Sequence, residues 1–137
     1  MSPGSLKLYS YSRCSTCRKA IAWLNHQGIP FSVVDITVTP PSRAELALAW
    51  ERLPSPLRLF NTSGLSYRAL GAAVVKEMEP DQAIKALAAD GKLIRRPFLI
   101  SSDGSLLLVG FDSLAWSQVL ANLPLEPSAD PVPESGH

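Results

Sequence analysis

The feature that most constrains the fold is a strand that leads straight into a helix, with two cysteines at the junction. Residues 6–11 alternate apolar with polar or aromatic side chains and are rich in strand formers. From Ser15 to Gln27 the apolar residues recur at helical spacing, and Gly28 supplies a stop signal. Cys14 and Cys17 lie where the strand ends and the helix begins. The first predicted unit is therefore a strand, a thiol-bearing turn and a helix.

The next segments predict a second strand and a helical insert. Residues 29–36 are β-branched and end before two prolines, which indicates a strand parallel to the first. Ser42 and Glu45 form a capping-box pair that opens a helix ending before residue 54. Residues 59–71 are turn-rich with short helical pieces, and Pro80 opens a further helix that Gly91 ends.

The C-terminal third predicts a hairpin and a closing helix. Residues 97–110 form two apolar runs around a Ser-Asp-Gly turn, a pattern typical of a hairpin. Residues 111–123 predict a helix with Asp112 as its N-cap. Residues 124–137 carry four prolines and few apolar side chains, so we expect a mobile tail after a single domain of residues 1–123.

Charge and cysteine usage exclude several classes of protein. The formal net charge is +1, which gives no electrostatic excess for holding nucleic acid or an anionic membrane. The N-terminus lacks a basic stretch followed by an apolar run, and no run approaches the ~18 apolar residues of a membrane span. We therefore expect a soluble cytoplasmic protein. Two cysteines three positions apart are too few for a disulfide-stapled secreted domain, so they indicate a redox or metal site.

The position of Cys14 favours redox chemistry. Unpaired N–H groups and the positive end of a helix dipole at a helix start stabilise a thiolate, and Arg13 and Arg18 add positive charge. Cys14 is therefore the predicted nucleophile. Three helical residues turn the chain by roughly 300°, which brings Cys17 beneath Cys14 as the resolving thiol.

Two other interpretations of the cysteines remain open. They could be half of a zinc site, but a tetrahedral site needs four ligands and only His26 and His137 are left to supply nitrogen. We therefore expect no metal. The cysteines could also be small buried hydrophobic residues, as many free cysteines are.

A second group of candidate residues lies at the start of the predicted hairpin. Arg95 and Arg96 immediately precede Pro97. In a thioredoxin-like arrangement a cis proline here would lie beside the thiol turn, so we expect a cis Arg96–Pro97 bond and an Arg96 side chain that points at Cys14. A guanidinium suits an oxyanion or carboxylate and also stabilises a thiolate. Arg95 is expected to be a solvated surface charge.

The remaining notable side chains are assigned structural roles. The three tryptophans occupy apolar helix faces and are expected in the core, and His26 is expected to be exposed. Residues 61–63 resemble a turn or a helix cap, although a polar loop near the thiols could also position a substrate.

Several motifs together resemble the ArsC/Spx family. Residues 14–31, CSTCRKAIAWLNHQGIPF, closely resemble its Spx/MgsR branch, while LIRRPFLI and LLVGF resemble a second signature of the family. Residues 59–71 are similar to a segment of the arsenate-reductase-like members. The resemblance implies a thioredoxin-like (glutaredoxin-like) α/β fold: a mixed four-stranded sheet flanked by helices, with a helical insert between strands 2 and 3.

The resemblance implies one of two activities. Glutaredoxin-coupled arsenate reductases use a cysteine matching Cys14 and an oxyanion-binding arginine matching Arg96. The resemblance therefore implies an anion-binding set made of Arg96 and residues next to these two positions: Arg13, Ser15, Thr16 and Pro97. Such enzymes need no bound cofactor but take electrons from glutathione, glutaredoxin or thioredoxin. The chain departs from their pattern at Asn61 and Thr62, and after the hairpin, where those enzymes carry further arginines.

Spx proteins instead carry a redox switch matching Cys14 and Cys17, and bind the C-terminal domain of the RNA polymerase α subunit. The insert here does not resemble the Spx surface that meets polymerase, and the tail is proline-rich and acidic rather than basic and helical. The sequence therefore predicts a thiol-disulfide oxidoreductase of the arsenate-reductase-like class, with a redox-sensing regulator as the alternative.

Overall fold

A four-stranded mixed sheet organises the part of the chain that carries the cysteines. The computed structural model describes residues 4–121, and the strands are β1 (Leu6–Ser10), β2 (Ser32–Asp35), β3 (Phe98–Ser101) and β4 (Leu107–Val109). They are ordered β2-β1-β3-β4, with β1 parallel to β2 and the other two pairs antiparallel. The predicted order of elements and the mixed sheet are confirmed.

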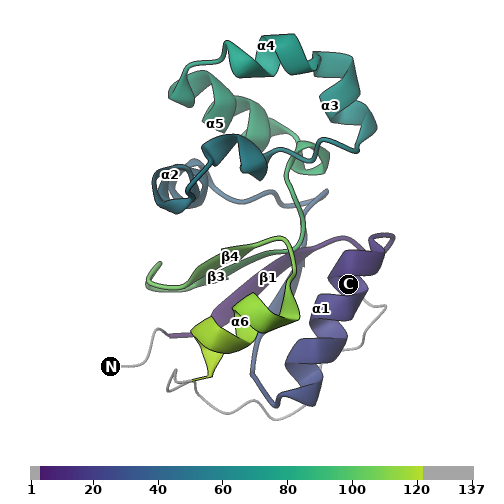
Figure 1. Cartoon of the computed structure of the whole chain (residues 1–137), viewed down its shortest axis with the longest axis vertical. Helices are drawn as coiled ribbons and strands as arrows, with labels where there is room; N and C mark the ends of the chain where they lie inside the picture. The colour runs from purple at the N-terminus through teal and green to yellow at the C-terminus, as the bar shows by residue number, and fades with distance from the viewer. Residues whose placement is uncertain (1–3, 122–137) are drawn as a thin grey trace. The chain divides into compact units, whose positions relative to one another are not determined.

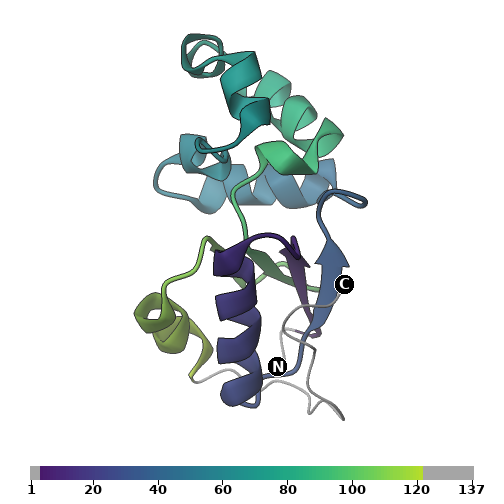
Figure 2. The same ribbon diagram turned by 90° about the vertical axis from the view of Figure 1, so that its right-hand side faces the viewer.

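The chain divides into two compact units, one formed by residues up to Asp35 and from Arg96 onward, the other by Ile36–Arg95. The first contains the sheet with α1 (Ser15–His26) and α6 (Ser113–Leu120). Figures 1 and 2 show both helices on the same face of the sheet. The second is the predicted helical insert, with α2 (Arg43–Arg52), η1 (Pro56–Leu59), α3 (Leu65–Leu70), α4 (Ala72–Lys76), α5 (Pro80–Ala89) and η2 (Gly91–Leu93).

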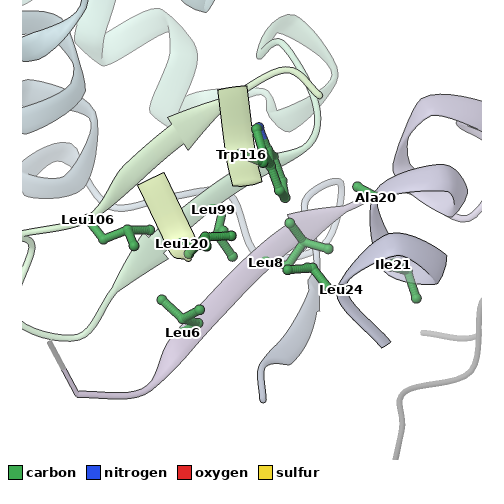
Figure 3. Close-up of a cluster of buried hydrophobic side chains, with 9 residues drawn as sticks. All are labelled: Leu6, Leu8, Ala20, Ile21, Leu24, Leu99, Leu106, Trp116 and Leu120. Carbon is green, nitrogen blue, oxygen red and sulfur yellow. The ribbon is translucent and has the colours of Figure 1, made fainter. Parts of the chain in front are cut away.

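The core of the sheet unit lies between β1, β3 and the two helices (Figure 3). Leu8 of β1 is the register partner of Leu99 of β3, and both are fully buried. Leu24 reaches this cluster from α1 and Trp116 from α6. Trp116 also donates its indole N–H to the carbonyl of Gly110 at 3.0 Å, which satisfies its one polar group. This packing fixes α1, and with it the thiol-bearing turn, on the sheet.

The insert has its own apolar interior, in which α2 packs against α5. The predicted capping box is present: Ser42 Oγ accepts from the Glu45 N–H at 3.1 Å, and the Glu45 carboxylate accepts from the Ser42 N–H at 2.9 Å. Pro80 stands at the start of α5 as predicted, after an N-cap at Glu79. Gly91 lies against the carbonyl of Ile36, where a side chain would collide.

The predicted boundaries of two strands are too long. The second strand was expected over 29–36, but Ile29 donates its N–H to the Leu24 carbonyl at 3.0 Å, which closes the end of α1 and delays the strand to Ser32. The first strand ends at Ser10 because the Tyr11 carbonyl accepts from the N–H of Cys14.

The closing segments follow the sequence more closely. Asp112 is the N-cap of α6 and accepts from Leu114 N–H at 3.0 Å. His26 is exposed as expected and Trp116 is buried, whereas Trp23 and Trp50 are only half-buried. The predicted tail at 124–137 lies outside the described residues, and the boundary of a 1–123 domain stays a prediction.

Candidate functional site

The thiol pair lies at the turn between β1 and α1. Cys14 is the N-cap residue of α1, with an extended backbone conformation, and its carbonyl accepts the first helical hydrogen bond from Arg18 N–H at 3.1 Å. Its own N–H donates to the Tyr11 carbonyl at 2.9 Å. Both cysteines are free thiols; Cys14 is half-buried, while Cys17 is fully buried in the first turn of the helix.

The two thiols have opposite electrostatic environments. A hydrogen bond from the Cys17 thiol is the largest influence on Cys14, and together with the Cys17 backbone N–H and the charge of Arg96 it lowers the pKa of Cys14 to about 5 against the effect of burial. The same hydrogen bond and burial raise the pKa of Cys17. Cys14 is therefore the thiolate at neutral pH, and Cys17 holds the proton that the pair shares.

Arg96 supplies the positive charge beside Cys14. It precedes β3, and the Arg96–Pro97 peptide bond is cis, as predicted from the sequence. The guanidinium interacts with the Cys14 sulfur both by charge and by a side-chain hydrogen bond. Its carbon Cζ stands 5.2 Å from the centroid of the Tyr11 ring, a cation–π arrangement. Arg96 is therefore held between an aromatic face and the nucleophilic sulfur.

The other predicted site residues lie around the start of α1, except Pro97, which lies before β3. Arg13 and Ser15 are exposed at the start of α1, and Thr16 is half-buried there. Pro97 is buried, and its carbonyl accepts from Gly110 N–H at 2.8 Å. Arg18 is exposed, and its guanidinium donates to the Ser12 carbonyl at 2.7 Å. The structure thus brings Cys14, Cys17 and Arg96 together, with Arg13, Ser15 and Thr16 at the rim.

Two contributors to the site were missed by sequence reasoning. Tyr11 holds Arg96 with its ring, and its backbone interacts with the Cys17 sulfur. Ser10 is buried at the end of β1 beside the same sulfur. The sequence held no signal for Ser10, because a serine at a strand end is an ordinary residue and its burial appears only in the structure.

The described residues show no metal centre and no membrane helix. Among residues 4–121, no three His, Cys, Asp or Glu side chains gather closely enough to hold a metal ion. None of the helices in this range combines the length and apolarity that a bilayer crossing requires.

Comparison with known proteins identifies the family. The ArsC family model matches residues 9–119, a span that includes the thiol turn, the insert, Arg96 and the hairpin. The chain belongs to the ArsC family. Its fold is accordingly the thioredoxin-like fold of that family, as the resemblance of its motifs implied.

Individual relatives include both uncharacterised proteins and regulators. The chain is 40% identical over 109 residues to the uncharacterised protein YusI of Bacillus subtilis, covering 78% of this chain and 91% of YusI. It is 25% identical over 120 residues to the global transcriptional regulator Spx 2 of Lactococcus lactis, covering 87% and 86% of the two chains.

Among solved structures, a protein described as a possible arsenate reductase from Streptococcus mutans superposes with a TM-score of 0.73 at 37% identity, covering 79% of this chain and 92% of the other. The proteins similar to this chain thus include a possible arsenate reductase and a transcriptional regulator as well as uncharacterised proteins.

Proposed function

We propose that this protein is a thiol-disulfide oxidoreductase of the arsenate-reductase-like class, with Cys14 as nucleophile and Cys17 as resolving thiol. The observation that carries the proposal is the asymmetry of the thiol pair: one hydrogen bond stabilises a thiolate on the half-buried sulfur and keeps the proton on the buried one. A thiolate is the form that attacks disulfides, and an accessible thiolate next to a protonated thiol is the arrangement that such exchange requires.

The proposed reaction has two exchanges. The Cys14 thiolate attacks one sulfur of a substrate disulfide, which forms a mixed disulfide and releases the other half as a thiolate. Cys17 then attacks the Cys14 sulfur, the Cys14–Cys17 bond forms, and the second half leaves and takes the proton that Cys17 gives up. An external thiol reductant, of the glutathione, glutaredoxin or thioredoxin class, restores both thiols. No bound cofactor takes part.

The order of these steps follows from the causes of the two pKa shifts. The hydrogen bond to Cys14 is the largest effect that raises the pKa of Cys17, and the negative charge on Cys14 raises it further. Both effects disappear when Cys14 becomes a neutral mixed disulfide. Cys17 therefore becomes easier to ionise only after Cys14 has reacted.

Arg96 has a second role in this proposal, as a ligand for an anionic substrate. Its guanidinium stands beside Cys14, and a planar fork of N–H donors suits a carboxylate or an oxyanion such as arsenate. Arg13, Ser15, Thr16 and Pro97 complete the proposed anion-binding set around the turn. We place the protein in the cytoplasm, where thiol reductants keep such a pair reduced.

The test is a turnover assay with disulfide and with arsenate as separate substrates, each coupled in turn to glutaredoxin and to thioredoxin. The wild-type protein should turn over at least one substrate, and Cys14→Ser should abolish the activity. Cys17→Ser should keep the first exchange but stop at a mixed disulfide. Equal rates for the wild type and Cys14→Ser with every substrate and reductant would refute the enzymatic proposal.

A redox-sensing regulator that binds the RNA polymerase α subunit is the second candidate, favoured by the similarity to Spx 2 over most of both chains. Its discriminating test is a pull-down from a bacterial lysate with the oxidised and the reduced protein. Polymerase α recovered in a redox-dependent manner would favour the regulator, and turnover without capture would favour the enzyme.

A further inference from the structure

A buried serine next to the thiol pair lacks the hydrogen bond that such a group normally has. Ser10 is the last residue of β1 and is 0% exposed. Within residues 4–121, its Oγ has no hydrogen-bond partner of ordinary geometry. Buried side-chain hydroxyls are nearly always paired, so an unpaired one next to reactive groups calls for an explanation.

The turn that follows Ser10 brings its hydroxyl to Cys17. The hydrogen bond from Cys14 N–H to the Tyr11 carbonyl, 2.9 Å long, folds the end of β1 back against the first turn of α1. The buried Cys17 sulfur therefore lies near both the Ser10 hydroxyl and the Tyr11 backbone, and each lowers the pKa of Cys17. Because Ser10 Oγ makes no well-formed hydrogen bond, its effect on the pKa of Cys17 in the dithiol state comes from its proximity to the Cys17 sulfur.

We propose that Ser10 is a positioning residue for the resolving step, whose hydroxyl donates a hydrogen bond to the Cys17 sulfur as that sulfur becomes a thiolate and attacks Cys14. This inference rests on the proposed function. In the dithiol state Cys17 is a neutral thiol that donates to Cys14, and a thiol sulfur is a weak acceptor. Ser10 gains a strong acceptor only when Cys17 ionises, since hydrogen bonds to an ionised group are the stronger ones.

Other charged groups near this position are present in both the wild type and a variant that lacks the Ser10 hydroxyl. Cys14 is the N-cap of α1, Arg18 lies in the first turn of that helix, and Arg96 precedes β3. Asp35 ends β2 and is the register partner of Ser10. In the mixed disulfide Cys14 no longer carries a charge, while Arg96, Arg18 and Asp35 remain. A variant that removes only the hydroxyl of Ser10 leaves all of these groups in place.

The experiment mixes the protein with an aromatic disulfide that releases coloured thionitrobenzoate, followed by stopped-flow absorbance from pH 5 to 9. Attack by Cys14 releases one equivalent in a first phase, and attack by Cys17 on the mixed disulfide releases a second. Ser10→Ala should raise the pH midpoint of the second phase by about one unit, and slow that phase about tenfold below the midpoint. The first phase should be unchanged, which also shows that the variant folds. Ser10→Thr, which restores a hydroxyl, should return the second phase toward wild type.

Each remaining outcome refutes one specific statement. A second phase with the wild-type pH midpoint in Ser10→Ala would overturn the role of Ser10. Equal slowing of both phases in Ser10→Ala, or no recovery in Ser10→Thr, would show a general disturbance of the turn and would overturn it too. Absence of any second phase in the wild type would instead overturn the proposed function, because Cys17 would then not resolve. Cys17→Ala is the control that should lack the second phase.

Discussion

The acidity of Cys14 should depend on its two partners to different degrees. The Cys17 thiol is the largest contributor to the low pKa of Cys14, and Arg96 contributes by charge and by hydrogen bonding. An opposite charge within ~4–6 Å commonly shifts a pKa by about one to three units, and we expect the lower end for Arg96 because Cys14 is half solvated. Arg96→Ala should therefore raise the pKa of Cys14 from about 5 to about 6.

The shift gives a large change in reactivity at low pH. A thiol with a pKa of about 5 is about 50% ionised at pH 5, and one with a pKa of about 6 is about 10% ionised. Alkylation of Cys14 by iodoacetamide should thus slow about fivefold at pH 5 and hardly change at pH 8. Cys17→Ala should raise the midpoint further than Arg96→Ala, because it removes the strongest hydrogen bond to the thiolate.

The assay is the alkylation rate of Cys14 across pH 4 to 10, with the adduct located by peptide mass spectrometry. Arg18→Ala is the matched control, since it removes an equal charge that is directed at the Ser12 carbonyl, and its midpoint should stay within a few tenths of a unit. An unchanged midpoint in both Arg96→Ala and Cys17→Ala would refute the account of how the thiolate is stabilised. A larger shift in Arg96→Ala than in Cys17→Ala would reverse the assigned ranking.

Three further changes test a contact of the site and the packing inside each of the two units. Tyr11→Leu should raise the pKa of Cys14 by a few tenths of a unit in the alkylation profile, because it removes the ring that holds Arg96. Tyr11→Phe keeps the ring and should match the wild type. A shift in Tyr11→Phe as large as that in Tyr11→Leu would count against the cation–π contact. Leu24→Ala should lower the free energy of unfolding by about 2–5 kcal/mol in urea titrations, since the Leu24 side chain is fully buried where α1 packs on the sheet. A loss below about 1 kcal/mol would contradict that packing. Gly91→Ala should cost about 1–3 kcal/mol by the same measurement, because its Cβ would collide with the Ile36 carbonyl, and a neutral effect would show that the backbone there yields easily.

The local elements of the fold could be predicted because short-range signals determine them. The hairpin turn is one example: Asp103 accepts from Ser105 N–H at 2.9 Å and from Ser101 Oγ at 2.8 Å. The five residues 101–105 therefore carry their own stabilising side-chain hydrogen bonds. Those bonds to an exposed carboxylate also lower the pKa of Asp103, with Ser105 as the main cause. The caps at Ser42 and Asp112 are of the same local kind.

The parts of the site that sequence reasoning missed depend on contacts between distant segments or on a turn's detailed path. Cys14 could be assigned from its place before the helix, but its strongest partner is the thiol one turn later, and its charged partner arrives from before β3. Arg96 could be predicted because a proline follows it and because it matches an arginine of arsenate reductases. Ser10 and Tyr11 gave no motif, since their roles follow from how the chain folds back after β1. A strand-end serine is usually an unremarkable polar residue, and only burial without a partner distinguishes it.

The central claim, that Cys14 and Cys17 are one redox pair, is tested most directly by the mass of the protein after mild peroxide treatment. The wild type should lose two hydrogens, and digestion without reductant should yield a single peptide that links Cys14 to Cys17. Cys17→Ser should instead accumulate a sulfenic acid or a glutathione adduct on Cys14. A wild-type protein that carries such an adduct on Cys14 while Cys17 stays a free thiol would contradict the account.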